Sequence, residues 1–344
     1  MEDITVSIVI ICMNNMKNIY PCLESIRKHT RVSYEVLVVA YLFTEENLKK
    51  VKSDFPWVTF VVSDEIRGFS ENNNLALRCA KGKYCFVVND DTEMKMPVID
   101  ELVKTIELLP DNVAIVSPVT THPDGRIQFC GRPYINWKHI ILQSFHLWKE
   151  MKGGKAVNQK GVFKSYNIVG AAFLIKRDIF KNIGWFDERY FFCPEDIALS
   201  TTLNKKGFAC YVNSDVHIIH YGGMSGKSSS IVQTATYPAA MRGKLIFFGH
   251  RWYSLLALRL TNAFLYPLKY VYHKCRSIVK KSPNGDEICA IGDLHCIRHI
   301  FSSKTPKEIF SRYFIELKTE CSVSKLSKSK TTPKRNEPDT VSDS

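Results

Sequence analysis

The first 118 residues alternate between apolar, β-branched runs and amphipathic segments, and this alternation constrains the fold more than any other feature of the sequence. The run VSIVIIC at residues 6–12 is apolar on both faces, as expected of a strand inside a parallel sheet. Similar runs predict strands at 34–39, 58–62, 84–88 and 113–118, and the segments between them predict helices at 20–29, 45–54, 70–80 and 97–109. Strands and helices in this order predict an α/β fold with an open sheet.

The rest of the sequence divides into an insertion, the end of the α/β domain and a C-terminal region. Residues 120–165 mix glycine, proline, aromatic residues and lysine without a sustained period, which predicts a loop-rich insertion. Strands at 168–175, 209–212 and 216–220 and a helix at 197–206 would complete an α/β domain over residues 1–240. Residues 241–324 predict a helical, basic region, and the polar segment 325–344 predicts a disordered tail.

Composition narrows the class of protein. With 344 residues and 45% hydrophobic side chains, the chain can bury a sizeable core. Its 11 cysteines lack C-x-x-C pairs and zinc-like spacing, which indicates reduced thiols in the cytoplasm. The N-terminus lacks the basic segment and cleavage site of a secretory signal, and the sequence lacks the stretch of about 18 uncharged apolar residues that predicts a membrane-spanning helix.

The net charge of +13 lies mainly in the C-terminal third, where residues 241–344 hold 19 lysines and arginines against 9 acids. No recognisable nucleic-acid-binding module accompanies this charge, so we expect no nucleic-acid partner. Residues 244–272 predict one helix, with Lys244, Arg251 and Arg259 in a sector of about 80°. Two interpretations stay open, a helix that lies on an anionic membrane surface and a core helix with a wet basic edge.

The strand predicted at 84–88 runs into three polar side chains, Asn89, Asp90 and Asp91. Open α/β sheets bind ligands at the carboxyl ends of their strands, which is where this cluster would lie. Mg²⁺ and Mn²⁺ prefer carboxylate oxygens and commonly bridge one or two protein carboxylates to substrate phosphates. The cluster is therefore either half of such a metal site or an ordinary solvated turn.

Two further positions are candidates for chemistry. Glu195 and Asp196 follow the aromatic run YFFCP, where partial desolvation would favour general-base catalysis. The pair is equally typical of the first turn of a helix, because acids stabilise helix N-termini. His220 ends an apolar strand, and a lone histidine in such a place is more often a structural residue than a ligand.

Taken in order, these segments resemble a known family. VSIVIICMNN, YEVLVV, RGFSENNN, YCFVVNDDTE, NIVGAAFLIKRDIFKNIGWFDERYFFCPEDIAL and VHIIHYGGMS together are similar to the family 2 glycosyltransferases, most nearly to their rhamnosyltransferase-like branch. The resemblance covers about residues 4–226. It implies the GT-A fold, a Rossmann-like mixed sheet with flanking helices, to which the helical basic region would be added.

The resemblance also implies an activity, the inverting transfer of a sugar from a nucleotide-diphosphate donor, dTDP-rhamnose-like or UDP-linked, to a hydroxyl of a glycan or lipid-linked glycan. Mg²⁺ or Mn²⁺ would bind the diphosphate, held by Asp91 and His220. Asp196 matches the family's catalytic base, with Glu195 beside it. The nucleotide-sugar-binding positions that the resemblance implies are Asn14, Arg67, Gly68, Phe69, Asn89 and Asp90. A lipid-linked acceptor would suit a cytoplasmic enzyme attached to the inner face of a membrane.

Two positions depart from the family's pattern. Ala40 stands where the family usually has an aspartate that reads the nucleobase, and Ala198 replaces an acid two residues after Asp196. An alternative class therefore stays open, a catalytically impaired relative that binds sugar nucleotides or serves as an assembly subunit. A sugar nucleotidyltransferase is disfavoured, because CMNNMKN lacks the glycine-rich, basic signature expected near the first strand.

Overall fold

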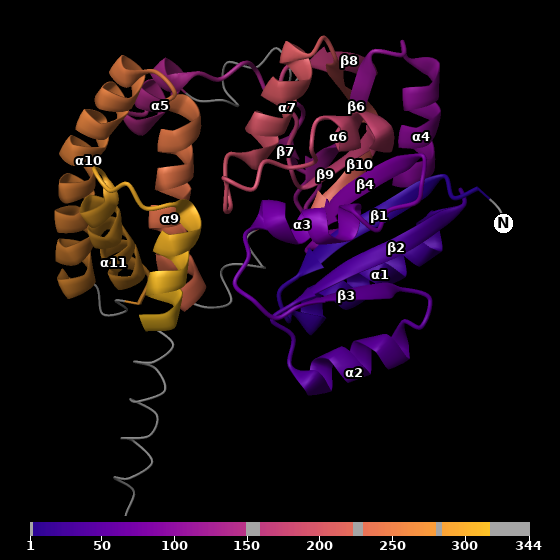
Figure 1. The fold of residues 1–344 in the computed structure, drawn as a ribbon, viewed down its shortest axis with the longest axis horizontal. Coiled ribbons are helices and arrows are strands. Elements are labelled where there is room, and N and C mark those ends of the chain that lie inside the picture. Colours follow the sequence, from indigo (N-terminus) through magenta and orange to yellow (C-terminus); the bar gives the residue numbers. More distant parts are fainter. Residues whose placement is uncertain (1–2, 149–158, 223–229, 280–283, 317–344) are drawn as a thin grey trace, which may run out of the picture.

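A computed structural model describes residues 3–148, 159–222, 230–279 and 284–316 of the chain. These residues form two parts that lie side by side, an α/β domain built on one sheet and a domain of helices (Figure 1). The tail predicted at 325–344 lies outside the described residues.

The α/β domain is built on a mixed sheet, to which the described residues contribute ten strands. The strand order is β3-β2-β1-β4-β9-β6-β10-β5, with β7 paired to β6 and β8 paired to β10. Strands β1 to β4 run parallel to one another, whereas β9 is antiparallel to both β4 and β6. The strands are β1 Val6–Cys12, β2 Tyr34–Tyr41, β3 Thr59–Ser63, β4 Tyr84–Asn89, β5 Thr92–Glu93, β6 Val113–Thr121, β7 Ile127–Phe129, β8 Val162–Ser165, β9 Ala172–Lys176 and β10 Ala209–His220. This architecture confirms the predicted α/β fold class.

Helices cover both faces of the sheet. On one face, Ile8 and Ile10 of β1 share a core with Leu23 of α1, and on the other face Val9 shares a core with Ala76 of α3. Because side chains alternate along a strand, a strand covered on both faces must be apolar throughout, which explains the run VSIVIIC. The helices of this domain are α1 Met16–His29, α2 Glu45–Asp54, α3 Phe69–Leu77, α4 Val98–Leu108, α6 Arg177–Asn182 and α7 Glu195–Lys205.

Several elements agree with the sequence prediction, and two regions differ from it. The predicted bounds of β1 and α2 are confirmed. The two strands predicted at 209–212 and 216–220 are one strand, β10, whose pairing with β6 is irregular between Asn213 and His217. The insertion at 120–165 is less loop-rich than expected, because its described residues form β7, β8 and helix α5 (Trp137–Ser144).

The prediction of one helix over residues 244–272 is wrong. The structure has two helices there, α9 (Ser230–Phe248) and α10 (Trp252–Val279), separated by residues 249–251. Gly249 directly follows α9, and glycine is common just beyond the end of a helix. Lys244 therefore lies on α9, Arg251 lies in the break and Arg259 lies on α10, so the three residues do not form one basic sector.

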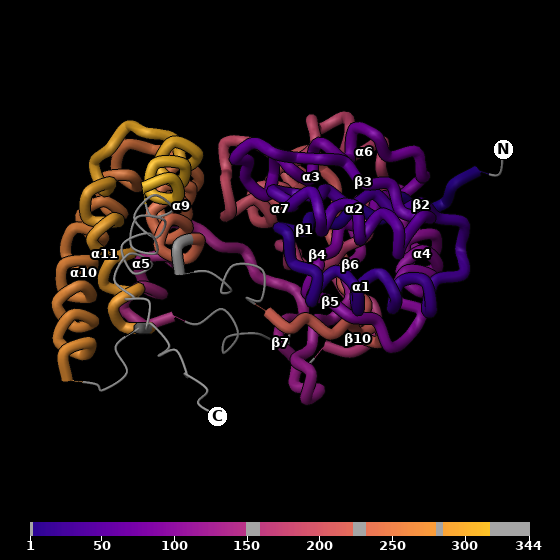
Figure 2. The backbone as a smooth tube through the Cα atoms, turned by 90° about the horizontal axis from the view of Figure 1, so that it is seen from below, coloured from indigo at the N-terminus to yellow at the C-terminus, as the bar shows by residue number. Residues whose placement is uncertain are grey.

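The second domain consists of α5, α9, α10, α11 (Asn284–His299) and a helix at residues 306–316. Helix α10 is its outermost element in both views, on the side away from the sheet (Figures 1 and 2). Helix α5 packs against α10, so the insertion at 120–165 contributes to this domain. No described helix combines the length and the apolar composition that crossing a bilayer requires.

The two domains meet at the segment that precedes α7. The ring of Phe191 packs against Phe310 of the helix at 306–316, with ring centroids 4.5 Å apart. A side chain at Gly243 of α9 would come within 2.1 Å of the carbonyl oxygen of Cys193, so this close contact requires the glycine. Packing of the helical domain therefore holds the chain just before the first turn of α7.

We expect Phe310→Ala to lower the free energy of unfolding by about 3–5 kcal/mol, because it removes a fully buried ring from the joint between the domains. Phe301→Ala is the matched control, since Phe301 is 62% exposed and its contact with Arg259 is worth about 0.5–1 kcal/mol. Chemical denaturation followed by circular dichroism measures both variants. Equal and small losses in the two variants would contradict the packing described here.

Candidate functional site

The polar residues singled out in the sequence lie along one edge of the sheet. Asn14 follows β1, Arg67 follows β3, Asn89 ends β4 and His220 ends β10. Asp196 lies in the first turn of α7. The carboxyl ends of parallel strands are where open α/β sheets bind ligands, so this edge is the candidate site.

Asp91 and His220 are neighbours at this edge. The Nε2 atom of His220 lies 3.3 Å from Oδ1 of Asp91, and the side chains are 13% and 3% exposed respectively. The Nδ2 atom of Asn89 lies 3.5 Å from the same histidine nitrogen. On the other side of the ring, Oε1 of Gln128 lies 2.6 Å from Nδ1 of His220. The structure thus brings together three residues that the sequence predicted, with Gln128 as an additional partner.

This arrangement fits a divalent metal ion. The Gln128 oxygen accepts a hydrogen bond from Nδ1 of His220, so the lone pair of the neutral imidazole lies on Nε2, toward Asp91. A carboxylate and an imidazole lone pair 3.3 Å apart favour a cation between them. The described residues hold no group of three or more His, Cys, Asp or Glu side chains that could bind a metal by themselves. Two protein ligands suffice for Mg²⁺ or Mn²⁺ when substrate phosphates complete the coordination.

Asp196 is held by a charged partner and by the backbone. Nη1 of Arg132 lies 2.6 Å from Oδ2 of Asp196, in an ion pair with about 15% of each side chain exposed. The backbone N–H of Gly170 donates to the same oxygen at 3.3 Å, and the N–H of Ile197 donates to Oδ1 at 2.8 Å. The carboxylate is therefore fixed in position by contacts with three separate segments of the chain.

Glu195 lies in a different electrostatic environment. Burial, reinforced by the charge of Asp196, raises the pKa of Glu195 well above that of an ordinary glutamate. Its Oε2 atom is buried and has no hydrogen-bond partner among the described residues. The neutral form of Glu195 is therefore favoured, while Asp196 forms the ion pair. The two acids also form the first turn of α7, so the helix-start interpretation holds as well.

A short backbone path connects the two acidic clusters. The N–H of Asn89 donates to the carbonyl of Ala171 at 2.9 Å, and the preceding residue, Gly170, donates to Asp196. A Cβ atom at Gly170 would lie 3.4 Å from Cβ of Asp196, so the backbone packs directly against the acidic turn. Residues 170 and 171 therefore link the end of β4 to the start of α7.

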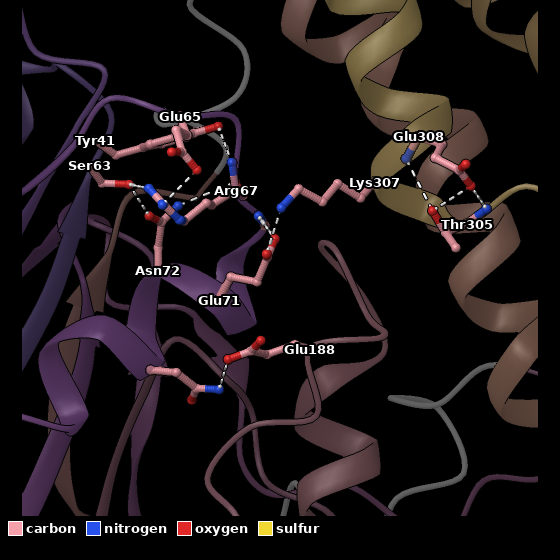
Figure 3. Close-up of polar contacts among 12 residues, drawn as sticks. Tyr41, Ser63, Glu65, Arg67, Glu71, Asn72, Glu188, Thr305, Lys307 and Glu308 are labelled. Carbon is pink, nitrogen blue, oxygen red and sulfur yellow. Dashed lines mark hydrogen bonds and ion pairs between the residues drawn. The ribbon is translucent and has the colours of Figure 1, made fainter.

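Hydrogen bonds and ion pairs hold the loop after β3 at both of its ends (Figure 3). The guanidinium of Arg67 lies 3.2 Å from Oγ of Ser63 and 2.7 Å from Oε2 of Glu65. Glu71 of α3 accepts from the N–H of Gly68 at 3.1 Å, and its other oxygen lies 2.7 Å from Nζ of Lys307. Lys307 lies on the helix at 306–316, so its ion pair with Glu71 connects the helical domain to the residues that hold this loop.

Gly68 has a packing role that the sequence did not indicate. A Cβ atom at this position would lie 2.4 Å from the carbonyl oxygen of Phe191 and 2.7 Å from its Cα atom. These are backbone atoms that cannot move aside cheaply, so only glycine fits here. The expected role of Gly68 at the nucleotide stays a prediction beside this packing role.

The other predicted nucleotide-binding residues make contacts within the fold. Oδ1 of Asn14 accepts hydrogen bonds from the start of α2, the shorter at 2.9 Å. The ring of Phe69 packs edge-on against Phe186. Asp90 is buried near Cys12, and its charge adds to the effect of burial in raising the pKa of that thiol. None of these contacts tests a nucleotide-binding role, so the three roles stay predictions.

Ala40 is followed by a residue with a polar group, Tyr41. Ala40 is fully buried in β2, and the next residue, Tyr41, is buried with its hydroxyl accepting the N–H of Arg67 at 3.3 Å. Burial raises the pKa of Tyr41 to about 12, so the phenol stays neutral. Position 40 itself therefore has no polar side chain, and the hydroxyl of the next residue, Tyr41, holds the Arg67 loop.

Sequence reasoning missed three residues of the site, Arg132, Gln128 and Lys307. Arg132 and Gln128 lie in the insertion at 120–165, and Lys307 lies in the basic C-terminal region. Each pairs with a residue more than 60 positions away, and no motif surrounds it. Such pairs are identified by their positions in space and not by their sequence neighbours.

Comparison with known proteins decides the family. The family model described as Glycosyl transferase family 2 matches residues 7–184, more than half of the chain. The chain belongs to glycosyl transferase family 2. The family that the sequence resembles is therefore confirmed.

Two curated relatives of this family 2 glycosyltransferase agree with the rhamnosyltransferase-like branch. The chain is 24% identical over 163 residues to the O-antigen biosynthesis protein RfbC of Myxococcus xanthus, covering 46% of this chain and 12% of the relative. It is 26% identical over 146 residues to the N-acetylglucosaminyl-diphospho-decaprenol L-rhamnosyltransferase of Mycobacterium tuberculosis, covering 40% of this chain and 47% of the relative. The chain thus spans less than half of the length of either relative.

A solved structure supports the fold. GalNAc-T7, determined with UDP, GalNAc and Mn²⁺, matches with a TM-score of 0.51 and 17% identity, over 68% of this chain and 47% of that chain. At this identity the match concerns the architecture alone, and it agrees with a GT-A-type sheet with flanking helices.

We expect the contribution of Glu195 to the free energy of unfolding to fall as the pH rises. The folded protein retains the Glu195 proton at a pH where the unfolded chain, with a pKa of about 4.3, has lost it. Above that pH the native state binds more protons, so the free energy of unfolding falls by up to about 1.4 kcal/mol per pH unit until the folded pKa is reached.

Urea unfolding of wild type and Glu195→Gln at a series of pH values measures this contribution. The wild type should lose stability relative to the variant as pH rises above the ordinary glutamate pKa. The same pH dependence in both proteins would contradict the raised pKa of Glu195.

Proposed function

We propose that this chain is an inverting glycosyltransferase that moves a sugar from a nucleotide-diphosphate donor, dTDP-rhamnose-like or UDP-linked, to a hydroxyl of a glycan or lipid-linked glycan. The observation that carries the proposal is the backbone path through Gly170 that joins the pair Asp91 and His220 to Asp196. One edge of the sheet thereby holds both a cation-binding pair and a fixed carboxylate. The names of the relatives, an O-antigen biosynthesis protein and a rhamnosyltransferase, support the substrate class.

Asp91 and His220 would hold the divalent metal ion, Mg²⁺ or Mn²⁺. When bound, the ion stabilises the negative charge that grows on the diphosphate leaving group. Gln128 fixes the orientation of the His220 ring and keeps its lone pair on Nε2. Asn89, 3.5 Å from the same nitrogen, restrains the ring from the side of β4.

Asp196 would act as the general base. It would accept the proton of the acceptor hydroxyl as the oxygen bonds to the anomeric carbon and the diphosphate departs, with inversion at that carbon. A carboxylate has about four acceptor positions, and described groups occupy three on Asp196, those from Arg132, Gly170 and Ile197. The remaining position is available for the acceptor hydroxyl.

Arg132 and Glu195 would play different roles beside the proposed base, Asp196. Arg132 compensates the charge of Asp196 and fixes the plane of its carboxylate. Glu195 is favoured in its neutral form, so it adds no second negative charge beside the base and is the poorer proton acceptor.

The donor nucleotide would bind along the ends of β1, β3 and β4, through Asn14, Arg67, Gly68, Phe69, Asn89 and Asp90. The loop that carries three of these residues is fixed by Glu71 and Lys307, so the helical domain supports the nucleotide side of the site.

We expect Asp196→Asn to lower kcat/KM about 10²–10⁴-fold, because the amide cannot take the acceptor proton, while donor binding stays near the wild-type value. Asp91→Ala should weaken both transfer and metal-dependent donor binding. A panel of nucleotide sugars with Mn²⁺ measured by thermal shift reports donor binding and identifies the donor, because a ligand raises apparent stability by mass action.

Asp124→Asn is the matched control, since Asp124 is an exposed acid on the loop between β6 and β7 and should leave transfer unchanged. Full transfer by Asp196→Asn would contradict the role of the base. A wild-type chain that binds a donor but transfers no sugar from any member of the panel would favour the catalytically impaired alternative, which Ala40 and Ala198 suggest.

A further inference from the structure

The outer face of α10 exposes a continuous row of apolar side chains. We call this row the outer stripe, and it consists of Trp252, Leu256, Leu260, Phe264, Leu268 and Tyr272. Its members are four residues apart, so each lies one turn from the next and about 40° further around the axis, and the row winds along the exposed side of α10. Trp252 is 77% exposed and Phe264 is 60% exposed, values typical of residues with no cover from the described fold.

Adjacent residues widen the outer stripe. Tyr253, Val271, Ile278 and Val279 of α10 are also exposed. Beside α10, the exposed ring of Phe145 lies 6.4 Å from that of Phe264, measured between centroids, so the region after α5 extends the surface. A contiguous exposed apolar surface of this kind marks an interaction site, unlike single exposed leucines.

Helix α10 itself carries charges of one sign. Helix α10 contains no aspartate or glutamate over its 28 residues, and α5 contains none either. The basic residues of α10 are Arg259, Lys269, Lys274 and Arg276, of which the two lysines are exposed. Arg276 lies 3.4 Å from Asp286 of α11, and Lys269 lines a cavity with Asp293 of α11, so Lys274 is the cation of α10 that we assign to this surface.

We propose that the outer stripe binds the surface of an anionic phospholipid bilayer, with α10 lying in the plane of the membrane. Helices that do so combine an apolar face, interfacial tryptophan and tyrosine, and flanking lysine and arginine, all of which α10 presents. Trp252, Tyr253 and Tyr272 supply the interfacial aromatic residues. Each lysine near an anionic surface adds attraction that salt weakens.

A second copy of the chain fits this face less well. Two outer stripes packed together would bring Lys274 of each α10 toward another helix that offers no acid to pair with it. An anionic bilayer compensates the same charges. Helix α10 itself is the outermost element in both views, on the side away from the α/β domain (Figures 1 and 2).

This proposal does not depend on the proposed transferase activity. It also replaces the sector of Lys244, Arg251 and Arg259 expected from the sequence, because those residues do not lie on one helix. The surface that the structure offers is defined by exposed apolar residues of α10 and by Lys274 beside them.

The test is co-sedimentation of the full chain with vesicles of phosphatidylcholine alone or with phosphatidylglycerol added. Wild type should bind the anionic vesicles, and Leu260→Glu with Phe264→Glu should lower the partition coefficient at least about tenfold, because two apolar side chains no longer leave water. Leu108→Glu is the matched control, since Leu108 is 87% exposed on the α/β domain and should not change binding. Lys274→Gln should lower binding to anionic vesicles about fivefold.

Thermal unfolding and circular dichroism establish that each variant is folded, as expected for changes at exposed positions. Binding that ignores lipid charge, or that Leu260→Glu with Phe264→Glu leaves unchanged, would overturn the proposal. A wild-type dimer in light scattering that the same double variant dissociates, without vesicle binding, would assign the outer stripe to a second copy instead.

Discussion

The contact on which the rest of the structure depends is the packing of Phe191 between the two domains. Its carbonyl oxygen accepts the N–H of Phe69 at 2.6 Å, and the missing side chain of Gly68 makes room for this approach. Its ring packs against Phe310 of the helical domain. Because Phe191 lies four residues before Glu195, one buried contact positions the start of α7 against the loop after β3. The proposed base and the proposed nucleotide loop are thereby positioned by the same contact.

The site carries several acids in a partly buried place, and each is accommodated in a different way. Asp196 is compensated by Arg132, and Asp91 lies beside His220. Glu195 has no such partner, and its neutral form is favoured instead. Removing charge from water is costly, so a buried acid is stable when it is paired or protonated. These different environments give the acids distinct chemical roles although Glu195 and Asp196 are adjacent in the chain.

The sequence predicted the sheet well because period and apolarity are local signals, as the bounds of β1 and α2 show. The resemblance to the family also predicted that Asn89, Asp91 and His220 would lie together, and the structure places Nε2 of His220 3.5 Å from Asn89 and 3.3 Å from Asp91. The sequence prediction failed where tertiary packing decides. Gly249 separates two helices that the apolar pattern of residues 244–272 joins, and Arg132 pairs with Asp196 across 64 positions. The packing role of Gly68 depends in the same way on a contact with a distant segment.

The central claim is that one edge of the sheet holds a metal-bound donor diphosphate beside Asp196. Anomalous scattering from crystals grown with Mn²⁺ and a nucleoside diphosphate tests it most directly, because the signal locates the ion without reference to activity. The account predicts one Mn²⁺ peak within coordination distance of Asp91 and His220, with the diphosphate as its other ligand. A nucleotide bound at another edge of the sheet, or a Mn²⁺ peak that neither residue touches, would contradict it.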